Sequence, residues 1–193
     1  MTSPLHELTR YGQSIWYDNL SRRLLASGEL ARLVREDGIV GVTSNPTIFD
    51  KAITDSEDYD ADIARLAADG KDAAAIYEAL VVEDVRQAAD VLLPVYEATG
   101  GRDGYVSLEV SPELARDGEG TVAAVRRLWR LVGRPNLMVK IPGTSEGLPA
   151  VEQCLYEGMN INVTLLFSVR RYEEVAWTYI RALERRWKEG MPV

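Results

Sequence analysis

Residues 136–141 read NLMVKI, a strand-forming apolar run that contains a single lysine, Lys140. Desolvation of a charged ammonium inside such a strand costs several kcal/mol. Burial and neighbouring positive charge lower the pKa of a lysine from ~10.4 to roughly 7–8, which leaves a free amine able to attack a carbonyl carbon. We therefore predict Schiff-base chemistry at Lys140. One alternative remains open, an edge-strand lysine whose stem lies on apolar surface while its ammonium reaches water.

Four other apolar runs also carry polar residues. They are SIWYD at 14–18, GIVGVTSN at 38–45, YVSLEV at 105–110 and INVTLLFS at 161–168. Asp18 closes the first run, Asn45 closes the second, and Glu109 lies within the third. Asn162 and Thr164 are two positions apart, so they share one face of a strand. From the residues alone, Asn45 also fits a turn before proline, and Thr164 also fits plain strand propensity.

Amphipathic helical segments lie between these runs, at 21–37, 121–133 and 168–187. Alternation of buried strands with helices predicts a parallel α/β sheet, because parallel strands need crossover connections. A closed (β/α)8 TIM barrel and an open doubly wound sheet both fit this pattern. Polar residues on nearly every strand favour the barrel, whose strand ends meet at one mouth. The sequence has no GxGxxG or GxxxxGK[ST] stretch that would hold a nucleotide on an open sheet.

The number of strand-helix units is smaller than a full barrel requires. We count about five units in this sequence, whereas a TIM barrel has about eight. An extra pair of helices is predicted between the second and third strands, as an insertion at about 46–99. The sequence stops at KEGMPV, residues 188–193, where a helix ends and the next strand is expected. We therefore expect a single TIM-barrel domain over 1–193 that is incomplete.

The composition suits a soluble cytoplasmic domain. Basic residues number 22 against 30 acidic ones, and the formal charge of −8 disfavours nucleic acid and anionic membranes as partners. We expect no secretory leader and no membrane helix, because no apolar run approaches ~18 residues. The single cysteine, Cys154, and the single histidine, His6, cannot by themselves supply a disulfide, a zinc site or a Ser-His relay. We expect no metal and no cofactor.

Four motifs carry a resemblance to a known family. They are GVTSNPTIF at 41–49, VSLEVSP at 106–112, LMVKIPGT at 137–144 and GMNINVTLLFS at 158–168. These motifs resemble, in the same order, the strand motifs of transaldolase, and the similarity covers the chain from about Tyr11 to Val193. The chain is most similar to the longer bacterial form, whose extra helices after the second strand account for the insertion. The resemblance implies a TIM barrel of the class I aldolase type.

The resemblance also implies an activity. Transaldolases of the pentose phosphate pathway move a dihydroxyacetone unit from a ketose phosphate, such as sedoheptulose 7-phosphate or fructose 6-phosphate, to an aldose phosphate. The family's Schiff-base lysine falls on Lys140, and its strand-one acid-base residue for C3–C4 cleavage falls on Asp18. The proton shuttle of imine formation falls on Glu109 and Thr164. Small sugar phosphates are therefore the expected partners.

The family's amides that hold the dihydroxyacetone hydroxyls fall on Asn45 and Asn162. Its phosphate-binding arginine and serine lie on later strands, so we expect them beyond Val193. Two alternatives to a transaldolase remain open. One is a related lyase that releases dihydroxyacetone to water, and the other is an inactive fragment that needs a complementary chain. An open barrel edge would also favour self-association.

Overall fold

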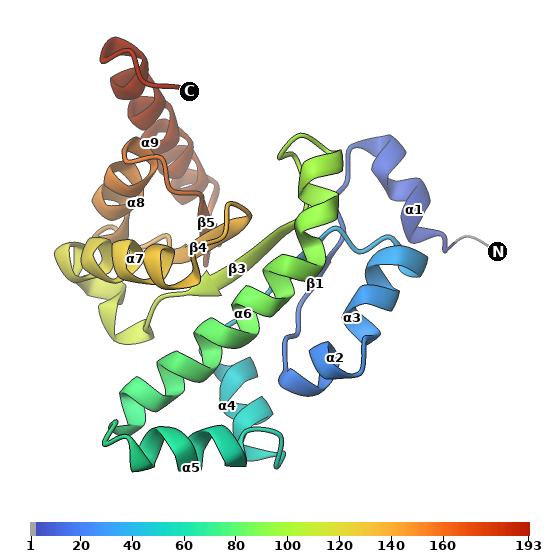
Figure 1. Ribbon diagram of the computed structural model, residues 1–193. Helices are drawn as coiled ribbons and strands as arrows, with labels where there is room; N and C mark the ends of the chain where they lie inside the picture. Colours follow the sequence, from blue (N-terminus) through green and yellow to red (C-terminus); the bar gives the residue numbers. More distant parts are fainter. Residues whose placement is uncertain (1–2) are drawn as a thin grey trace. The chain divides into compact units, whose positions relative to one another are not determined.

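The computed structural model describes residues 3–193. Its five strands form one sheet in the order β1-β2-β3-β4-β5 (Figure 1). The strands are β1 (Trp16–Tyr17), β2 (Gly41–Thr43), β3 (Tyr105–Glu109), β4 (Leu137–Pro142) and β5 (Ile161–Thr164). The pairs β1–β2, β2–β3 and β4–β5 are parallel. Parallel strands in chain order, with helices between them, confirm the predicted α/β architecture.

The chain divides into two compact units. The first contains the chain up to Ser107 together with Val132–Leu137, and the second contains Leu108–Leu131 and Met138–Val193. Strands β3 and β4 each contribute residues to both units. A single domain over 1–193 stays a prediction, and Met1 and Thr2 lie outside the described residues.

The first unit contains the helices that precede β3 (Figure 1). They are α1 (Leu5–Leu8), η1 (Thr9–Tyr11), α2 (Arg22–Ala26), α3 (Glu29–Arg32), η2 (Leu33–Asp37), α4 (Pro46–Thr54), α5 (Asp60–Ala68) and α6 (Ala73–Ala98). The predicted helical segment 21–37 is interrupted at Gly28, which adopts φ 74 between α2 and α3. Only glycine enters this left-handed region at little cost, so the first helix ends there. Helices α4, α5 and α6 occupy the stretch between β2 and β3.

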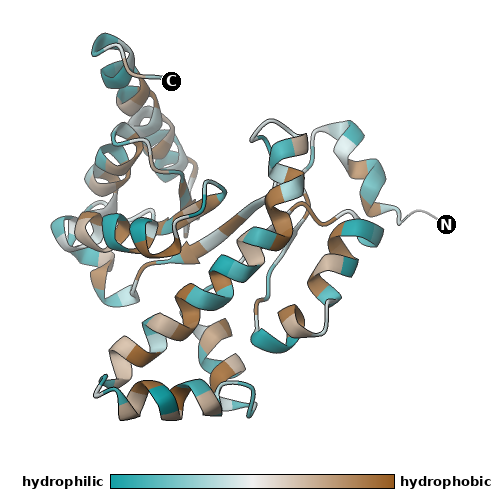
Figure 2. Ribbon diagram, viewed as in Figure 1, coloured by the Kyte–Doolittle hydropathy of each residue, from teal (hydrophilic) through white to brown (hydrophobic). Residues whose placement is uncertain are grey.

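Helix α6, of 26 residues, provides much of the core of the first unit. Its side chains Val85 and Leu92 are fully buried, and Leu80 is nearly so. Leu80 also joins a buried cluster with Tyr59 and Leu66 from the neighbouring turn and α5. Figure 2 shows hydrophobic and hydrophilic residues alternating along α5 and α6, as expected when one face of each helix is buried.

The second unit contains the helices that follow β3, β4 and β5. They are η3 (Pro112–Arg116), α7 (Gly118–Val132), whose last residue falls in the first unit, α8 (Gly147–Tyr156) and α9 (Val169–Lys188). Helices α8 and α9 pack together, and Val151, Cys154 and Ala182 are buried. Burial raises the pKa of the Cys154 thiol to about 12, so this cysteine stays a protonated core residue at neutral pH. Within residues 3–193, no helix has the length and apolar character needed to cross a membrane.

Strands β1 and β2 are held together by a close contact between an aromatic ring and a glycine. Trp16 lies opposite Gly41 in the parallel register. A methyl group at Gly41 would overlap the Trp16 indole, with Nε1 only 2.7 Å away. Gly41 therefore lets the Trp16 indole approach the backbone of β2 closely, next to the strand that leads into Asp18.

The Gly41→Ala substitution tests this packing. We expect it to lower the free energy of unfolding by about 1–3 kcal/mol, because the added methyl group overpacks the indole. Urea denaturation measures the loss, and the same substitution in a Trp16→Leu background provides the control. The loss should shrink to under about 1 kcal/mol in that background. Equal losses in both backgrounds would show that the indole contact is not the cause.

Candidate active site

Lys140 lies on an inner strand, because β4 stands between β3 and β5 in the sheet. Side chains alternate along the strand, and its neighbours Val139 and Ile141 are fully buried on the opposite face. The Lys140 side chain is 12% exposed. An edge-strand lysine is therefore the wrong interpretation of this residue. The ammonium is held among protein groups and needs a partner there.

Glu109, the last residue of β3, provides that partner. Its Oε2 lies 3.0 Å from Lys140 Nζ, and its side chain is 17% exposed. The backbone N–H of Val110 donates to the carbonyl oxygen of Lys140 at 3.1 Å, so the two strands are neighbours at this point. Each charge offsets part of the desolvation cost of the other. A carboxylate at this distance can also accept a proton from the ammonium.

Asn162 and Thr164 lie on β5, next to the lysine strand. In the parallel register Asn162 is the partner of Lys140, and Thr164 is the partner of Pro142. Both side chains are half-buried. Asn162 and Thr164 are two positions apart, so they share the face of the sheet that carries Lys140. The second unit therefore places four of the predicted site residues on one face of three adjacent strands, β3, β4 and β5.

These four residues offer a specific set of chemical groups. The amine is a nucleophile once deprotonated, the carboxylate exchanges protons, and the amide and hydroxyl donate and accept hydrogen bonds. Such a set suits a ligand with a carbonyl and several hydroxyl groups. Within residues 3–193, no group of three or more His, Cys, Asp or Glu side chains is arranged to hold a metal ion.

Asp18 and Asn45 belong to the first unit. Asp18 directly follows β1 and is exposed. Asn45 follows β2 as the N-cap of α4, and its Oδ1 accepts a hydrogen bond from the backbone N–H of Ile48 at 3.0 Å. The cap uses one of the two lone pairs of Oδ1. A single site that joins these two residues to the four on β3, β4 and β5 stays a prediction.

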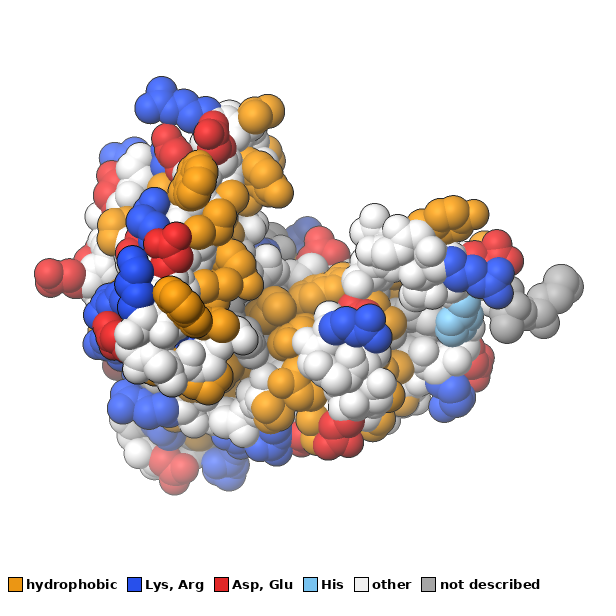
Figure 3. Space-filling view, turned by 90° about the horizontal axis from the view of Figure 1, so that it is seen from above, with side chains coloured by type: hydrophobic (Ala, Val, Ile, Leu, Met, Phe, Trp, Pro, Cys, Tyr) orange, Lys and Arg blue, Asp and Glu red, His pale blue; other side chains and the backbone are white. Residues whose placement is uncertain are grey.

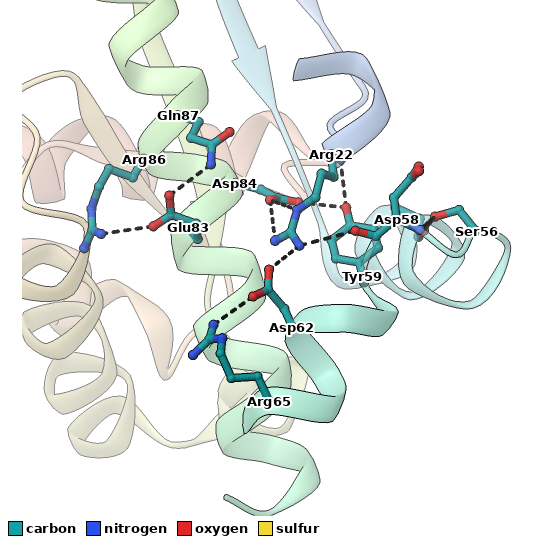
Figure 4. A network of polar contacts seen from close by, with 11 residues as sticks. Arg22, Ser56, Asp58, Tyr59, Asp62, Arg65, Glu83, Asp84, Arg86 and Gln87 are labelled. Atoms are coloured by element: carbon teal, nitrogen blue, oxygen red, sulfur yellow. Dashed lines mark hydrogen bonds and ion pairs between the residues drawn. The ribbon is translucent and has the colours of Figure 1, made fainter. Parts of the chain in front are cut away.

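Arg22, Tyr59 and Asp84 form a polar cluster in the first unit that the sequence patterns did not predict (Figure 4). Asp84 is fully buried. Burial raises the pKa of its carboxyl group, against the opposing effects of the Tyr59 hydroxyl and the Arg22 charge. The signal in the sequence is that Asp84 lies four residues from both Leu80 and Ala88, inside the apolar stripe of α6. An acidic residue at such a position needs a buried partner.

The fold and the lysine-carboxylate pair define a class of protein, parallel α/β proteins with their reactive groups on the strands. The family model described as transaldolase/fructose-6-phosphate aldolase matches residues 15–184. The chain belongs to this family, which has the TIM-barrel fold, and the family resemblance of the four strand motifs is confirmed. The five strands described above, with the helices that follow them, are this chain's part of that fold.

Curated relatives agree with this assignment. The chain is 54% identical over 192 residues to a protein named transaldolase 2 from Nostoc punctiforme, covering 100% of this chain and 50% of that protein. It is 52% identical over 190 residues to a transaldolase from Trichodesmium erythraeum, covering 98% and 50%. A transaldolase from Acidothermus cellulolyticus is 53% identical over 190 residues, covering 98% and 51%. The chain therefore spans about half the length of these relatives.

Substitution of the Lys140–Glu109 pair tests its contribution to the fold. We expect Lys140→Met or Glu109→Leu alone to lower the free energy of unfolding by about 1–3 kcal/mol, because each leaves an uncompensated charge in a poorly hydrated position. The double substitution should be close to the parent protein, because both charges are gone. Urea denaturation of the four proteins gives the coupling energy.

The exposed pair Arg181–Glu152 provides the matched control, with side chains 52% and 30% exposed. Its coupling energy should stay under about 1 kcal/mol. If the losses of Lys140→Met and Glu109→Leu simply added in the double variant, the two groups would not be coupled.

Proposed function

We propose that this chain is part of a transferase that moves a dihydroxyacetone unit from fructose 6-phosphate or sedoheptulose 7-phosphate to an aldose phosphate. The covalent intermediate is a Schiff base on Lys140. The observation that carries the proposal is the ion pair between Lys140 and Glu109, with 3.0 Å between Nζ and Oε2. Family membership and the name transaldolase of the relatives support the same reaction.

Imine formation begins with a proton transfer. Glu109 accepts a proton from the Lys140 ammonium, and the free amine attacks the C2 carbonyl carbon of the ketose. The resulting carbinolamine loses its C2 oxygen as water. Glu109 and a water molecule held by Thr164 supply and remove the protons of this step. The product is a protonated imine, whose positive nitrogen accepts electrons from the C3–C4 bond.

Asp18 is the acid-base residue of bond cleavage in this proposal. It takes the proton of the C4 hydroxyl, C4 becomes the aldehyde carbon of the departing aldose phosphate, and the electron pair of the C3–C4 bond moves into the imine to give an enamine. The enamine carbon then attacks the aldehyde of the acceptor, whose oxygen receives a proton from Asp18. Hydrolysis of the new imine releases the ketose phosphate and restores Lys140.

Asn45 and Asn162 are proposed to hold the dihydroxyacetone unit while the first product leaves. The position of Asn162 opposite Lys140 in the strand register supports its part in this role. Neutral amides suit a neutral polyol fragment, because they both donate and accept hydrogen bonds. We place the phosphate site in the part of the relatives' length that this chain does not span. We also propose that the enzyme and its sugar-phosphate partners are cytoplasmic.

The family description favours a second candidate function, because it names fructose-6-phosphate aldolase beside transaldolase. In that reaction the enamine carbon takes up a proton in place of attacking an aldose, and water hydrolyses the resulting imine to release free dihydroxyacetone and restore Lys140. Competition with erythrose 4-phosphate separates the two functions. A transferase should release less dihydroxyacetone when the acceptor is present, whereas a lyase should release equal amounts with and without it.

Borohydride trapping tests the proposed nucleophile. With fructose 6-phosphate or dihydroxyacetone as donor, we expect reduction to fix a covalent adduct on Lys140, which peptide mass mapping locates. Lys140→Arg should abolish trapping, because a guanidinium stays protonated at any usable pH. An adduct on Lys51 or Lys71 instead would contradict the assignment of Lys140.

An apolar surface at the end of the chain supports a proposal about association. Most of the exposed large hydrophobic side chains lie on or around α9 and after β5, and Figure 3 shows a row of hydrophobic side chains on this part of the molecule. They are Leu165, Phe167, Val169, Tyr172, Trp177, Tyr179, Ile180, Trp187 and Val193. β5 is also the last strand of the sheet described here, with a strand neighbour on one side only. We propose that this C-terminal apolar surface binds a second copy of the 193-residue chain.

Sedimentation velocity at increasing protein concentration tests the association. We expect reversible self-association and binding of a dye that reports exposed apolar surface, both reduced by Phe167→Ser combined with Trp187→Ser. These side chains are 88% and 70% exposed, so their replacement leaves the core intact. Tyr11→Ser, at an 84% exposed site in the first unit, is the matched control and should change neither property. A dye-negative monomer at every concentration would rule the proposal out.

A further inference from the structure

The backbone on either side of Asp18 sets the position of its Cα atom and the direction of its Cα–Cβ bond. Within residues 3–193, no hydrogen bond or ion pair holds this side chain. Its position therefore depends on how the chain is held on either side. On the upstream side, Tyr17 of β1 pairs with Val42 of β2 in the parallel sheet. Asp18 is the next residue after Tyr17.

On the downstream side, the chain is held by burial and by a cap. Leu20 is fully buried, and Ser21 is the N-cap of α2, with its Oγ accepting from the backbone N–H of Leu24 at 3.2 Å. The next backbone N–H, that of Arg22, donates to the Tyr59 hydroxyl at 2.9 Å. This N–H is one of the first-turn donors of α2 that have no partner inside the helix. The segment around Asp18 is thus short and restrained at both ends.

The Tyr59 hydroxyl is itself held by a buried ionic group. It donates to Asp84 Oδ2 at 2.7 Å, and Arg22 donates to Asp84 Oδ1 from Nε at 3.2 Å and from Nη2 at 3.1 Å (Figure 4). The Arg22 guanidinium also lies over the Tyr59 ring, 4.5 Å from its centroid. Asp62 accepts a further hydrogen bond from Arg22 Nη1 at 2.6 Å. The cluster therefore ties the start of α2 to α5 and α6.

Apolar side chains of similar volume would fill this space at no desolvation cost, whereas a buried ion cluster must offset the loss of hydration of every charged group. Hydrogen bonds differ from apolar packing because they hold the bonded atoms at a defined distance and angle. Apolar packing tolerates small displacements, but the Tyr59 hydroxyl joins the Arg22 backbone to Asp84 in one geometry. Asp18 lies four residues before Arg22, whose backbone N–H is held by the Tyr59 hydroxyl.

We propose that Arg22, Tyr59 and Asp84 are positioning residues for Asp18, and that they hold its carboxylate where it can remove the C4 hydroxyl proton of the donor sugar. The inference rests on the proposed function. It gives the helices between β2 and β3 a role in the reaction, because α5 and α6 carry the groups that restrain the loop after β1. Displacement of a catalytic group by about 1 Å can cost ~100-fold in rate.

Tyr59→Phe tests the proposal, because it removes only the hydroxyl that links Arg22 to Asp84. Tyr77→Phe, on α6 of the same unit, is the matched control. Borohydride quenching of single-turnover reactions with fructose 6-phosphate separates two steps by mass, since an uncleaved donor leaves a six-carbon adduct on Lys140 and a cleaved donor leaves a three-carbon adduct. We expect Tyr59→Phe to slow cleavage ~10–100-fold, with imine formation unchanged.

The Asp18→Ala variant provides the reference, because it should accumulate the six-carbon adduct. Arg22→Lys, which keeps the positive charge but loses the forked donors, serves as the second variant if Tyr59→Phe does not fold. If the rates of imine formation and of cleavage both fell in proportion to the folded fraction, the role of Tyr59 would be purely structural and the proposal would be overturned. Unchanged rates of both steps in Tyr59→Phe would also overturn it.

A separate measurement distinguishes failure of the proposal from failure of the proposed function. If no sugar is trapped on Lys140, either in the 193-residue chain or in a protein in which the rest of the relatives' length is joined to it, the proposed function is wrong. The backbone amide chemical shifts of Asp18 and its neighbour Asn19 then test whether the Tyr59 hydroxyl positions Asp18. They should move in Tyr59→Phe and stay unchanged in Tyr77→Phe. Unchanged shifts in both variants would overturn the positioning role independently of any activity.

Discussion

The contact between Lys140 and Glu109 offsets part of the cost of placing a lysine side chain on an inner strand of a parallel sheet. The Lys140 side chain is 12% exposed, so a positive charge on it is poorly hydrated. The contact depends on the adjacency of β3 and β4 and on the register that places Val110 against Lys140. Once these two strands are in place, strand alternation puts Asn162 and Thr164 on the same face.

Two buried ionic groups thus stand at different places in the fold. The Lys140–Glu109 pair lies on the strands of the second unit, and the group around Asp84 lies among the helices of the first. Neither is the arrangement of greatest stability, because well-packed apolar residues commonly match or exceed a buried ion pair. Both hold polar atoms in defined directions beside residues with a proposed part in the reaction. This is the pattern expected where stability is given up for function.

The apolar surface around α9 has a different physical origin. Helix α9 packs against α8, and the buried Thr178 and Ala182 mark the packed face of α9. The exposed Trp177 and Trp187 lie outside it. Tryptophans with large exposed areas are uncommon on a monomeric surface and typical of association surfaces.

Local patterns in the amino-acid sequence predicted the five strands, the helical segments at 21–37, 121–133 and 168–187, the helical insertion at about 46–99 and the polar residues on the strands. The apolar run NLMVKI predicted that Lys140 lies in a strand, and the four motifs indicated the family. Only the tertiary structure decided that Glu109 is the partner of Lys140, that β4 is an inner strand and that Asp84 is held by Arg22 and Tyr59. The physical reason is that these contacts join residues 25 to 62 positions apart or depend on strand order. The spacing of residues along the sequence gives no information about contacts between distant residues or about strand order. Burial and strand register in the folded protein determine both of these.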